Sequence, residues 1–229
     1  MHESFKTWET NKTLEHAHKI QEREAIPQST WDVAPKDAYC IFMLFNLEAA
    51  DDEGHCILAL GPTDGALETY SYYRHSTKIE APGIMACLKD PMTFERLCDG
   101  SGWIVHGQPG NYWNEHVNAA IALWCDKAAY ERARAYAEAK KADTGTYNLV
   151  TYNCLTFVDD ALKQAGIRLV TKSGKRVRTI VPKEAFFEID NVEGAHKFEA
   201  WKYWFDLGKA PDNGLRTIDD VPGQDKPLE

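Results

Sequence analysis

The sequence lacks the features that mark several large classes of protein. Its six cysteines form no Cys-x-x-Cys pair, and no His-Glu-x-x-His pattern occurs, so we expect no metal site and no cofactor. The longest apolar run, residues 39–47, is much shorter than the roughly 20 residues of a membrane-spanning helix, and we expect no stable membrane insertion. The net charge of −9 repels phosphate backbones and argues against a nucleic-acid partner.

The first residues also lack the apolar core of a secretory signal, so we expect synthesis in the cytoplasm without a cleaved leader. With 229 residues and 44% hydrophobic content, the chain can bury one core as a single domain. We expect an N-terminal helical extension over residues 1–36, because this segment is polar with sparse apolar positions. A catalytic core over 38–190 and a C-terminal extension and tail over 191–229 follow.

Apolar runs separated by turn residues predict the strands of the core. Residues 38–47, 55–60 and 67–73 are rich in β-forming side chains, and the Gly-Pro-Thr-Asp-Gly sequence between the last two predicts a hairpin. A further short strand is expected at 103–106. Residues 168–181, with a central Ser-Gly-Lys, predict a second hairpin.

Helical spacing of apolar residues predicts two helices. Residues 112–141 give the longest one. Residues 154–165 give the second, with Asn153 as its N-cap and Gly166 just beyond its end. A short helix or turn is expected from Pro182. Strands and helices in separate runs predict an α+β fold.

The second predicted helix begins at Cys154, which makes this cysteine a candidate nucleophile. Unpaired N–H groups and the positive end of the helix dipole favour a thiolate and can stabilise an oxyanion. Asp159 and Asp160 lie one turn further on, and helical spacing places them toward solvent. The alternative interpretation is a small buried residue beneath the start of the helix.

A thiolate nucleophile needs an imidazole that carries the proton. His55 is the first candidate, because it opens a predicted strand directly after Gly54. A hydrogen-bonded structural histidine is equally common at such a position. His106, in a Gly/Pro-rich loop, is the second candidate, and His75 is the third.

Two short motifs resemble those of the circularly permuted NlpC/P60-like cysteine hydrolases. Asn-Cys-Leu-Thr-Phe-Val, residues 153–158, resembles the motif that opens their cysteine helix. Their histidine precedes the cysteine as a Gly-His pair at the start of a strand, and Gly54-His55 is similar to it. The resemblance covers about residues 38–190. It implies a papain-like antiparallel sheet packed against the helix that carries the cysteine, with Cys154 and His55 as the catalytic pair.

The resemblance also implies a third polar residue that orients the histidine from the following strand. Glu68 offers a carboxylate, which can hold the ring in one tautomer and stabilise the imidazolium. Ser71 and His75 are the alternatives on or just beyond the same strand. An exposed charge beside a turn is the competing interpretation of Glu68.

The function implied by this resemblance is a cysteine amidase or endopeptidase that cleaves peptidoglycan stem peptides. A single domain without a signal peptide resembles antibacterial toxins that type VI secretion systems deliver into the periplasm of a target bacterium. Peptidoglycan peptides, a cognate immunity protein and the secretion apparatus are then the expected partners. The first alternative is a thiol acyltransferase or lipid hydrolase similar to lecithin:retinol acyltransferase. The second is a non-catalytic binding module with the same fold.

Overall fold

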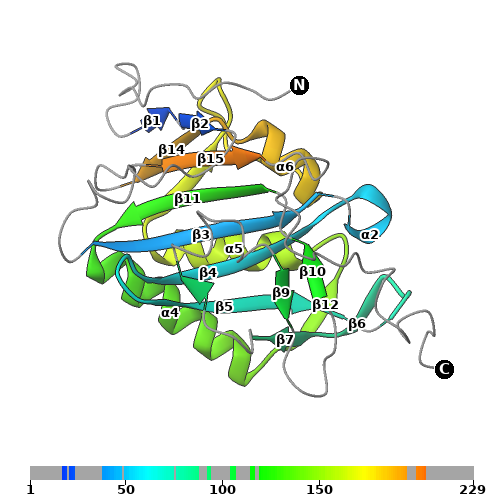
Figure 1. Ribbon diagram of the computed structural model, residues 1–229. Coiled ribbons are helices and arrows are strands. Elements are labelled where there is room, and N and C mark those ends of the chain that lie inside the picture. Colours follow the sequence, from blue (N-terminus) through cyan, green and yellow to red (C-terminus); the bar gives the residue numbers. More distant parts are fainter. Residues whose placement is uncertain are drawn as a thin grey trace.

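The structure is a computed structural model in which a central sheet carries helices against one face (Figure 1). The residues that it describes are 17–19, 21–23, 38–47, 49–74, 76–87, 92–93, 104–106, 114–116, 119–194 and 200–204.

The central sheet has eight strands in the order β2-β15-β11-β3-β4-β5-β7, with β8 also paired to β5. All neighbours are antiparallel except β15 and β2, which are parallel. The bounds are β2 (Gln21–Arg23), β15 (Ala200–Trp204), β11 (Ala119–Cys125), β3 (Tyr39–Asn46), β4 (His55–Pro62), β5 (Ala66–Tyr73), β7 (Ile84–Ala86) and β8 (Met92–Thr93).

The remaining strands form smaller sheets. They are β1 (Ala17–Lys19) with β14 (Asn191–Gly194) and β13 (Ile167–Val170), β9 (Ile104–His106) with β10 (Asn114–His116), and β6 (Glu80–Pro82) with β12 (Thr146–Asn148). The helices described are α2 (Ala49–Asp52), α4 (Lys127–Ala142), α5 (Cys154–Gln164) and α6 (Pro182–Glu188).

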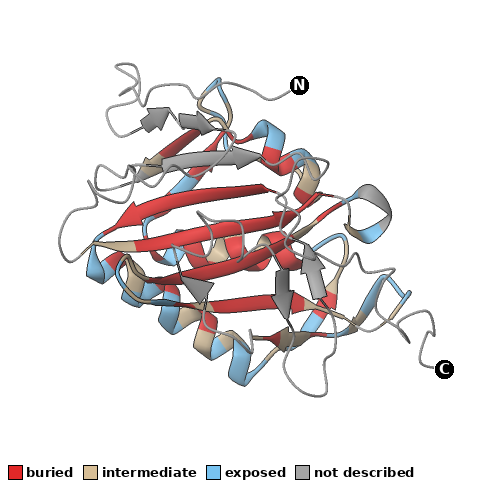
Figure 2. Ribbon diagram, viewed as in Figure 1, coloured by how far each residue is buried: buried red, intermediate tan, exposed pale blue. Residues whose placement is uncertain are grey.

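The central strands are buried on both faces (Figure 2). In β3, Met43 and Phe45 belong to the core cluster that includes the helices, while the intervening Phe42 and Leu44 are also fully buried. A continuous apolar run rather than an alternating one is what a strand covered on both sides requires. The sequence of β3 therefore encodes a strand at the centre of the molecule.

The helix α4 packs into this core through small residues. Ala129, Ala133 and Ala137 recur every fourth position and are fully buried. Asp126 caps the helix, since its side chain accepts a hydrogen bond from the N–H of Ala129 at 2.7 Å. Side chains of one methyl group let the helix approach the sheet and α5 closely, which fixes where α5 begins relative to the strands.

The predicted α+β class and the three strands of the core hairpin region are confirmed. The hairpin pairs β4 with β5, and Leu58 lies opposite Tyr70. The two predicted short elements at 103–106 and from Pro182 are the strand β9 and the helix α6. The papain-like topology stays a prediction.

The predicted helix over 112–141 is wrong in its first half. Residues 114–116 and 119–125 are the strands β10 and β11, and the helix begins only at Lys127. Every residue of β11 is buried, and a continuous apolar run satisfies helical spacing and a doubly covered strand equally well. Asp126, a good N-cap before an alanine-rich stretch, was the signal that separates the two elements.

The predicted N-terminal helix is also wrong where the structure describes it, because β1 and β2 are strands paired with β14 and β15. A polar segment without an apolar stripe gains little as an isolated helix but completes the hydrogen bonds of a sheet edge. The strands β14 and β15 extend the core past residue 190. The other residues of 1–36 and the tail beyond 204 lie outside the described part of the chain.

The hairpin predicted over 168–181 is confirmed only at its start. Val170 forms an isolated bridge with Arg176, but the strand partner of β13 is β14. The second arm of the predicted hairpin leads instead toward α6.

Candidate functional site

The helix α5 begins at Cys154, which is 3% exposed, and Asn153 caps it as predicted. The Asn153 side-chain oxygen accepts hydrogen bonds from the N–H groups of Leu155 and Thr156 at 3.0 and 3.2 Å. The Thr156 hydroxyl in turn accepts the Asn153 N–H at 2.6 Å. This reciprocal capping satisfies the first donors of the helix and fixes the cysteine at its first position.

Asn153 also joins α5 to two other segments. Its side-chain amide donates to the carbonyl oxygens of Leu149 at 3.1 Å and Ile180 at 2.8 Å. These bonds tie the start of α5 to the turn before it and to the chain that leads into α6. One buried side chain therefore determines where the cysteine lies relative to three elements.

The hydroxyl of Tyr147 lies within hydrogen-bonding reach of both the thiol and the backbone N–H of Cys154. A tight reversal brings it there, because Asn148 and Tyr152 exchange backbone hydrogen bonds of 2.8 and 3.0 Å. Burial, followed by the neighbouring thiol, raises the pKa of the Tyr147 hydroxyl. Tyr147 is therefore a neutral phenol beside the sulfur, able to donate one hydrogen bond.

Aromatic rings enclose this position from the sheet side. The ring of Tyr72 lies 5.2 Å from that of Tyr147, 5.7 Å from Tyr152 and 5.8 Å from Phe157. The Tyr72 hydroxyl donates to the carbonyl of Thr144 at 3.0 Å, which attaches the cluster to the chain before β12. The thiol thus lies in a largely apolar surrounding with few polar groups, in which each polar group has a large effect.

One of those polar groups is the guanidinium of Arg74, at the end of β5. Its central carbon lies 5.8 Å from the centroid of the Tyr147 ring. Its Nη1 is buried and has no hydrogen-bond partner among the described residues. Arg74 belongs to no recognisable motif, and Tyr147 opens the stretch that resembles the cysteine motif but was not predicted to contact the thiol, because only the chain reversal brings it to Cys154.

His55 lies against Ser71, with 2.9 Å between its Nε2 and the serine Oγ. Although the residue retains some accessible surface, its ring is enclosed by protein, and burial lowers the pKa of His55 to about 4. The imidazole is therefore neutral near pH 7. Ser71, which is 3% exposed, was one of the alternatives for a residue that orients His55.

The sheet separates His55 from Cys154. Cys56 and Tyr72 belong to the core cluster that contains Cys154 and the helices, so they face α5. Successive side chains of a strand point to opposite faces, and the register of β3, β4 and β5 is regular. His55 and Ser71 therefore face away from the helices. The structure therefore does not bring together Cys154 and His55, the catalytic pair predicted from the sequence. A shift of one residue along a strand moves a side chain to the other face of the sheet, and His55 lies on the face opposite to α5.

The carboxylate of Glu68 does not orient His55. Glu68 accepts hydrogen bonds from Arg134 Nε at 2.8 and 2.9 Å and from the Tyr70 hydroxyl at 2.7 Å. These contacts lie between β5 and α4, on the helix-covered face. Glu68 therefore belongs to an ion pair that joins strand to helix. His75 and the side chain of His106 lie outside the described residues.

The Gly-His motif has a structural explanation in the turn before β4. Gly54 has a φ of +87°, which side chains other than hydrogen rarely adopt. A Cβ there would lie 3.0 Å from the backbone nitrogen of Lys183 and 3.3 Å from the carbonyl oxygen of Asn46. Glycine is required for the close approach of α6, independently of any role for the histidine that follows.

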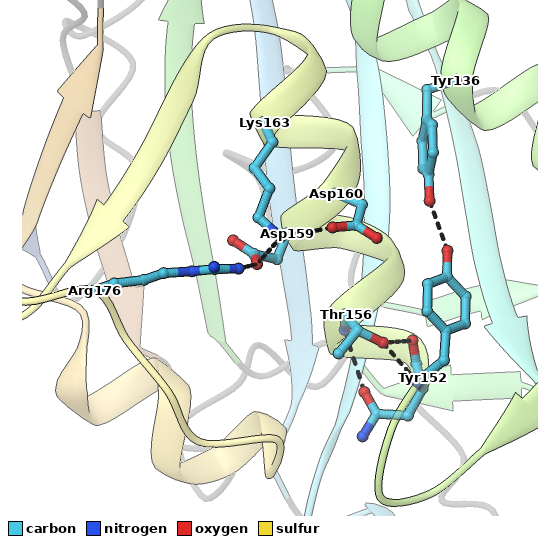
Figure 3. A network of polar contacts seen from close by, with 8 residues as sticks. Tyr136, Tyr152, Thr156, Asp159, Asp160, Lys163 and Arg176 are labelled. Carbon is cyan, nitrogen blue, oxygen red and sulfur yellow. Dashed lines mark hydrogen bonds and ion pairs between the residues drawn. The ribbon is translucent and has the colours of Figure 1, made fainter.

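Asp159 and Asp160 of α5 are partly exposed, in line with the predicted solvent-facing position, and they pair with basic side chains (Figure 3). Asp159 pairs with Lys163 and with Arg176, both at 2.8 Å, and Asp160 pairs with Lys163 at 2.6 Å. Their charge is compensated on the outer face of the helix. It therefore opposes a thiolate at Cys154 only weakly.

Within the described part of the chain, no cluster of three or more His, Cys, Asp or Glu side chains is arranged to hold a metal ion. No helix described here combines the length and the hydropathy needed to cross a membrane. Comparisons with models of known protein families, with curated proteins and with solved structures find no match for this chain. The resemblance to NlpC/P60-like hydrolases therefore rests on the two sequence motifs.

Proposed function

We propose that this protein is a thiol-dependent amide hydrolase with Cys154 as its nucleophile. The observation that carries the proposal is the position of this thiol at the capped start of α5, against the hydroxyl of Tyr147, whose ring the Arg74 cation also approaches. A helix N-terminus and a nearby cation both favour a thiolate. A neutral phenol supplies a hydrogen bond where charge develops during acyl transfer.

In the proposed reaction, the thiolate attacks the carbonyl carbon of an amide and the carbonyl electron pair moves onto oxygen. Asn153 already occupies the N–H groups of Leu155 and Thr156. The Cys154 N–H lies against the Tyr147 oxygen, so the Tyr147 hydroxyl is the donor proposed for the oxyanion. Collapse breaks the C–N bond, the amine leaves with the proton released by the thiol, and water hydrolyses the thioester to a carboxylate and the free thiol.

A side chain must carry the proton from the thiol to the leaving amine, and imidazole is the usual one. His55 faces the other side of the sheet, so we do not assign this step to it. His75 is the next residue after Arg74 in the chain. Variants His55→Gln and His75→Gln, assayed side by side, identify the carrier: the proposal expects loss of turnover in the second and near-normal turnover in the first.

For the substrate, we propose peptidoglycan stem peptides, cleaved by an antibacterial effector of a type VI secretion system. Support comes from the Asn-Cys motif, residues 153–158, and its likeness to NlpC/P60-like amidases. The test is incubation of purified protein with peptidoglycan sacculi and mass spectrometry of the muropeptides. New fragments that depend on Cys154 support the proposal, and an unchanged muropeptide pattern rejects this substrate.

One observation favours the lipid-directed alternative. Ile79 and Val150 are 60% and 58% exposed, and they lie on adjacent segments, because the N–H of Leu149 donates to the Ile79 carbonyl at 3.0 Å. Val150 lies on the turn that leads to Asn153 and Ile79 directly before β6, and together they can contact an acyl chain. Release of fatty acid from phospholipid vesicles, with no fragments from sacculi, would support a thiol lipid hydrolase.

The separation of His55 from Cys154 favours a second alternative, a non-catalytic binding module. In that case Cys154 is a small buried side chain beneath the helix start. Labelling with iodoacetamide as a function of pH separates the two. Alkylation of Cys154 that is already fast near pH 7 supports the enzyme. An alkylation rate that rises only at about pH 8.5, as for an ordinary thiol, supports the binding module.

A further inference from the structure

We propose that Arg74 binds a carboxylate group of the substrate beside the Cys154 thiol, so that the enzyme selects amides with a free carboxylate next to the scissile bond. The inference rests on the proposed hydrolase function and specifies its substrate class. It assigns Arg74 as a residue that determines specificity.

The first observation is that one nitrogen of the Arg74 guanidinium, Nη1, makes no hydrogen bond among the described residues. Three other arginines described in the structure have partners: Arg134 binds Glu68, Arg176 binds Asp159, and the Arg132 guanidinium donates to two backbone carbonyls at 2.8 and 2.9 Å. Arg74 Nη1 is buried without such a partner among the described residues. A buried N–H of a charged group that makes no hydrogen bond is costly, and a bound anion removes that cost.

The position of the guanidinium is the second observation. It lies 5.8 Å from the centroid of the Tyr147 ring, and the hydroxyl of the same ring reaches the Cys154 thiol and N–H. Arg74 and the thiol therefore contact the same tyrosine side chain, Arg74 at its ring and Cys154 at its hydroxyl. This spacing suits a substrate in which a carboxylate and the scissile carbonyl are separated by a few covalent bonds.

The chemistry of the surroundings selects an anion with the geometry of a carboxylate. A guanidinium presents two parallel N–H groups that match the two oxygens of a carboxylate. The Tyr147 phenol remains neutral and adds no negative charge that would compete for Arg74. A peptide fragment that ends in a carboxylate has this arrangement, whereas an internal amide of a protein does not.

The test compares two alkylating agents of nearly equal size, iodoacetate and iodoacetamide, on the full-length protein. Both form the same bond with sulfur, but only iodoacetate carries a carboxylate. Peptide mass spectrometry measures the rate at Cys154 for each agent, and glutathione gives the ratio for a free thiol. We expect the iodoacetate-to-iodoacetamide ratio to exceed that of glutathione and to fall about tenfold in Arg74→Gln, as expected for loss of one charge-assisted hydrogen bond.

Arg134→Gln is the matched control, since it removes the same charge from a partly exposed side chain of α4 that is paired with Glu68 of β5. Its ratio should equal that of the unmodified protein. Arg74→Lys keeps the positive charge but lacks the two parallel N–H groups of the guanidinium, and should give an intermediate iodoacetate-to-iodoacetamide ratio. It also supplies a second variant if Arg74→Gln does not fold, which circular dichroism checks.

The outcomes separate this inference from the proposed function. Fast iodoacetamide labelling of Cys154 with a ratio that Arg74→Gln leaves unchanged overturns the carboxylate site but leaves the nucleophile in place. A ratio at or below that of glutathione in the unmodified protein overturns it as well. Iodoacetamide labelling no faster than that of an ordinary buried thiol overturns the proposed hydrolase, and the inference with it.

Discussion

The two faces of the central sheet carry different chemistry. On the helix-covered face, Cys154 lies at a helix start with a neutral phenol and the Arg74 guanidinium close by. On the opposite face, His55 is neutral and held against the hydroxyl of Ser71. The first arrangement offers a candidate nucleophile with one hydrogen-bond donor beside it, and the second resembles a hydrogen-bonded structural pair. Two motifs in the right order along a chain can thus fold onto opposite sides of a sheet.

The largest effect is expected from removal of the thiol on the helix side. Cys154→Ala should lower the release of muropeptides by about 1,000-fold or more, because a covalent step has no substitute once its nucleophile is gone. Its thermal stability should change little, since a small side chain replaces a small one. Muropeptide release and a thermal melt, measured on the same preparation, check both. Turnover by Cys154→Ala equal to that of the unmodified protein would remove the chemical contrast between the two faces of the sheet.

The next effect concerns the capping residue that positions the cysteine. Asn153→Ala should lower the free energy of unfolding by about 2 to 3 kcal/mol, since it removes an N-cap worth about 1 kcal/mol and leaves the partly buried carbonyls of Leu149 and Ile180 without their donor. Urea denaturation measures it. Asn153→Asp keeps the cap but loses the amide donors, so its free energy of unfolding should lie between those of the unmodified protein and Asn153→Ala. A loss below about 1 kcal/mol in Asn153→Ala would show that other contacts position α5.

The pH dependence of stability sharpens the comparison on the other face. The pKa of His55 is about 4 in the folded protein and about 6.5 in the unfolded chain. The unfolded state therefore binds more protons between these values, so stability present above pH 6.5 is lost as the pH falls toward 4. Between pH 7 and 4.5 this contribution amounts to about 2 kcal/mol.

His55→Gln retains a group that can hydrogen-bond Ser71 but does not titrate. Its urea midpoint should therefore fall less than that of the unmodified protein between pH 7 and 4.5. Because His55 faces away from Cys154, turnover at pH 7 should remain within about twofold, in the range of a substitution distant from the reacting atoms. Turnover reduced a hundredfold would instead place His55 in the catalytic machinery.

The smallest effect is expected at Glu68. Its ion pair with Arg134 is partly exposed, so Glu68→Gln should lower the free energy of unfolding by less than about 1 kcal/mol and leave turnover unchanged. Urea denaturation and the muropeptide assay test the two parts separately. A large loss of turnover at normal stability would revive Glu68 as a residue that orients a catalytic base.

Much of the fold was predictable because local signals agreed with the tertiary structure. The hairpin of β4 and β5 has turn residues between β-forming runs, and α5 has Asn153 before it and Gly166 after it. Gly166 has a φ of +82°, as its place after the helix predicted. The segment over 112–125 was predicted wrongly, because an apolar run buried on both sides has no periodicity that distinguishes strand from helix.

The candidate site was predictable only in part. Cys154 was identified because helix capping is a local property, encoded within a few residues of sequence. Arg74 and the role of Tyr147 were missed, because Arg74 directly follows β5, Tyr147 lies in β12, and only the tertiary structure brings these segments together. His55 was identified as a histidine at a strand start. The face of the sheet that its side chain occupies depends on strand register, and a shift of one residue reverses that face.

Local sequence signals encode the strands of the core hairpin, the capped helix and the cysteine at its first position, since propensity, turn chemistry and capping act over a few residues. The face of the sheet that each side chain occupies, and the groups that surround the thiol, are set by the folded arrangement as a whole. Those depend on pairing between strands far apart in the chain, and on the close packing of α4 and α5 against them, which no short segment encodes.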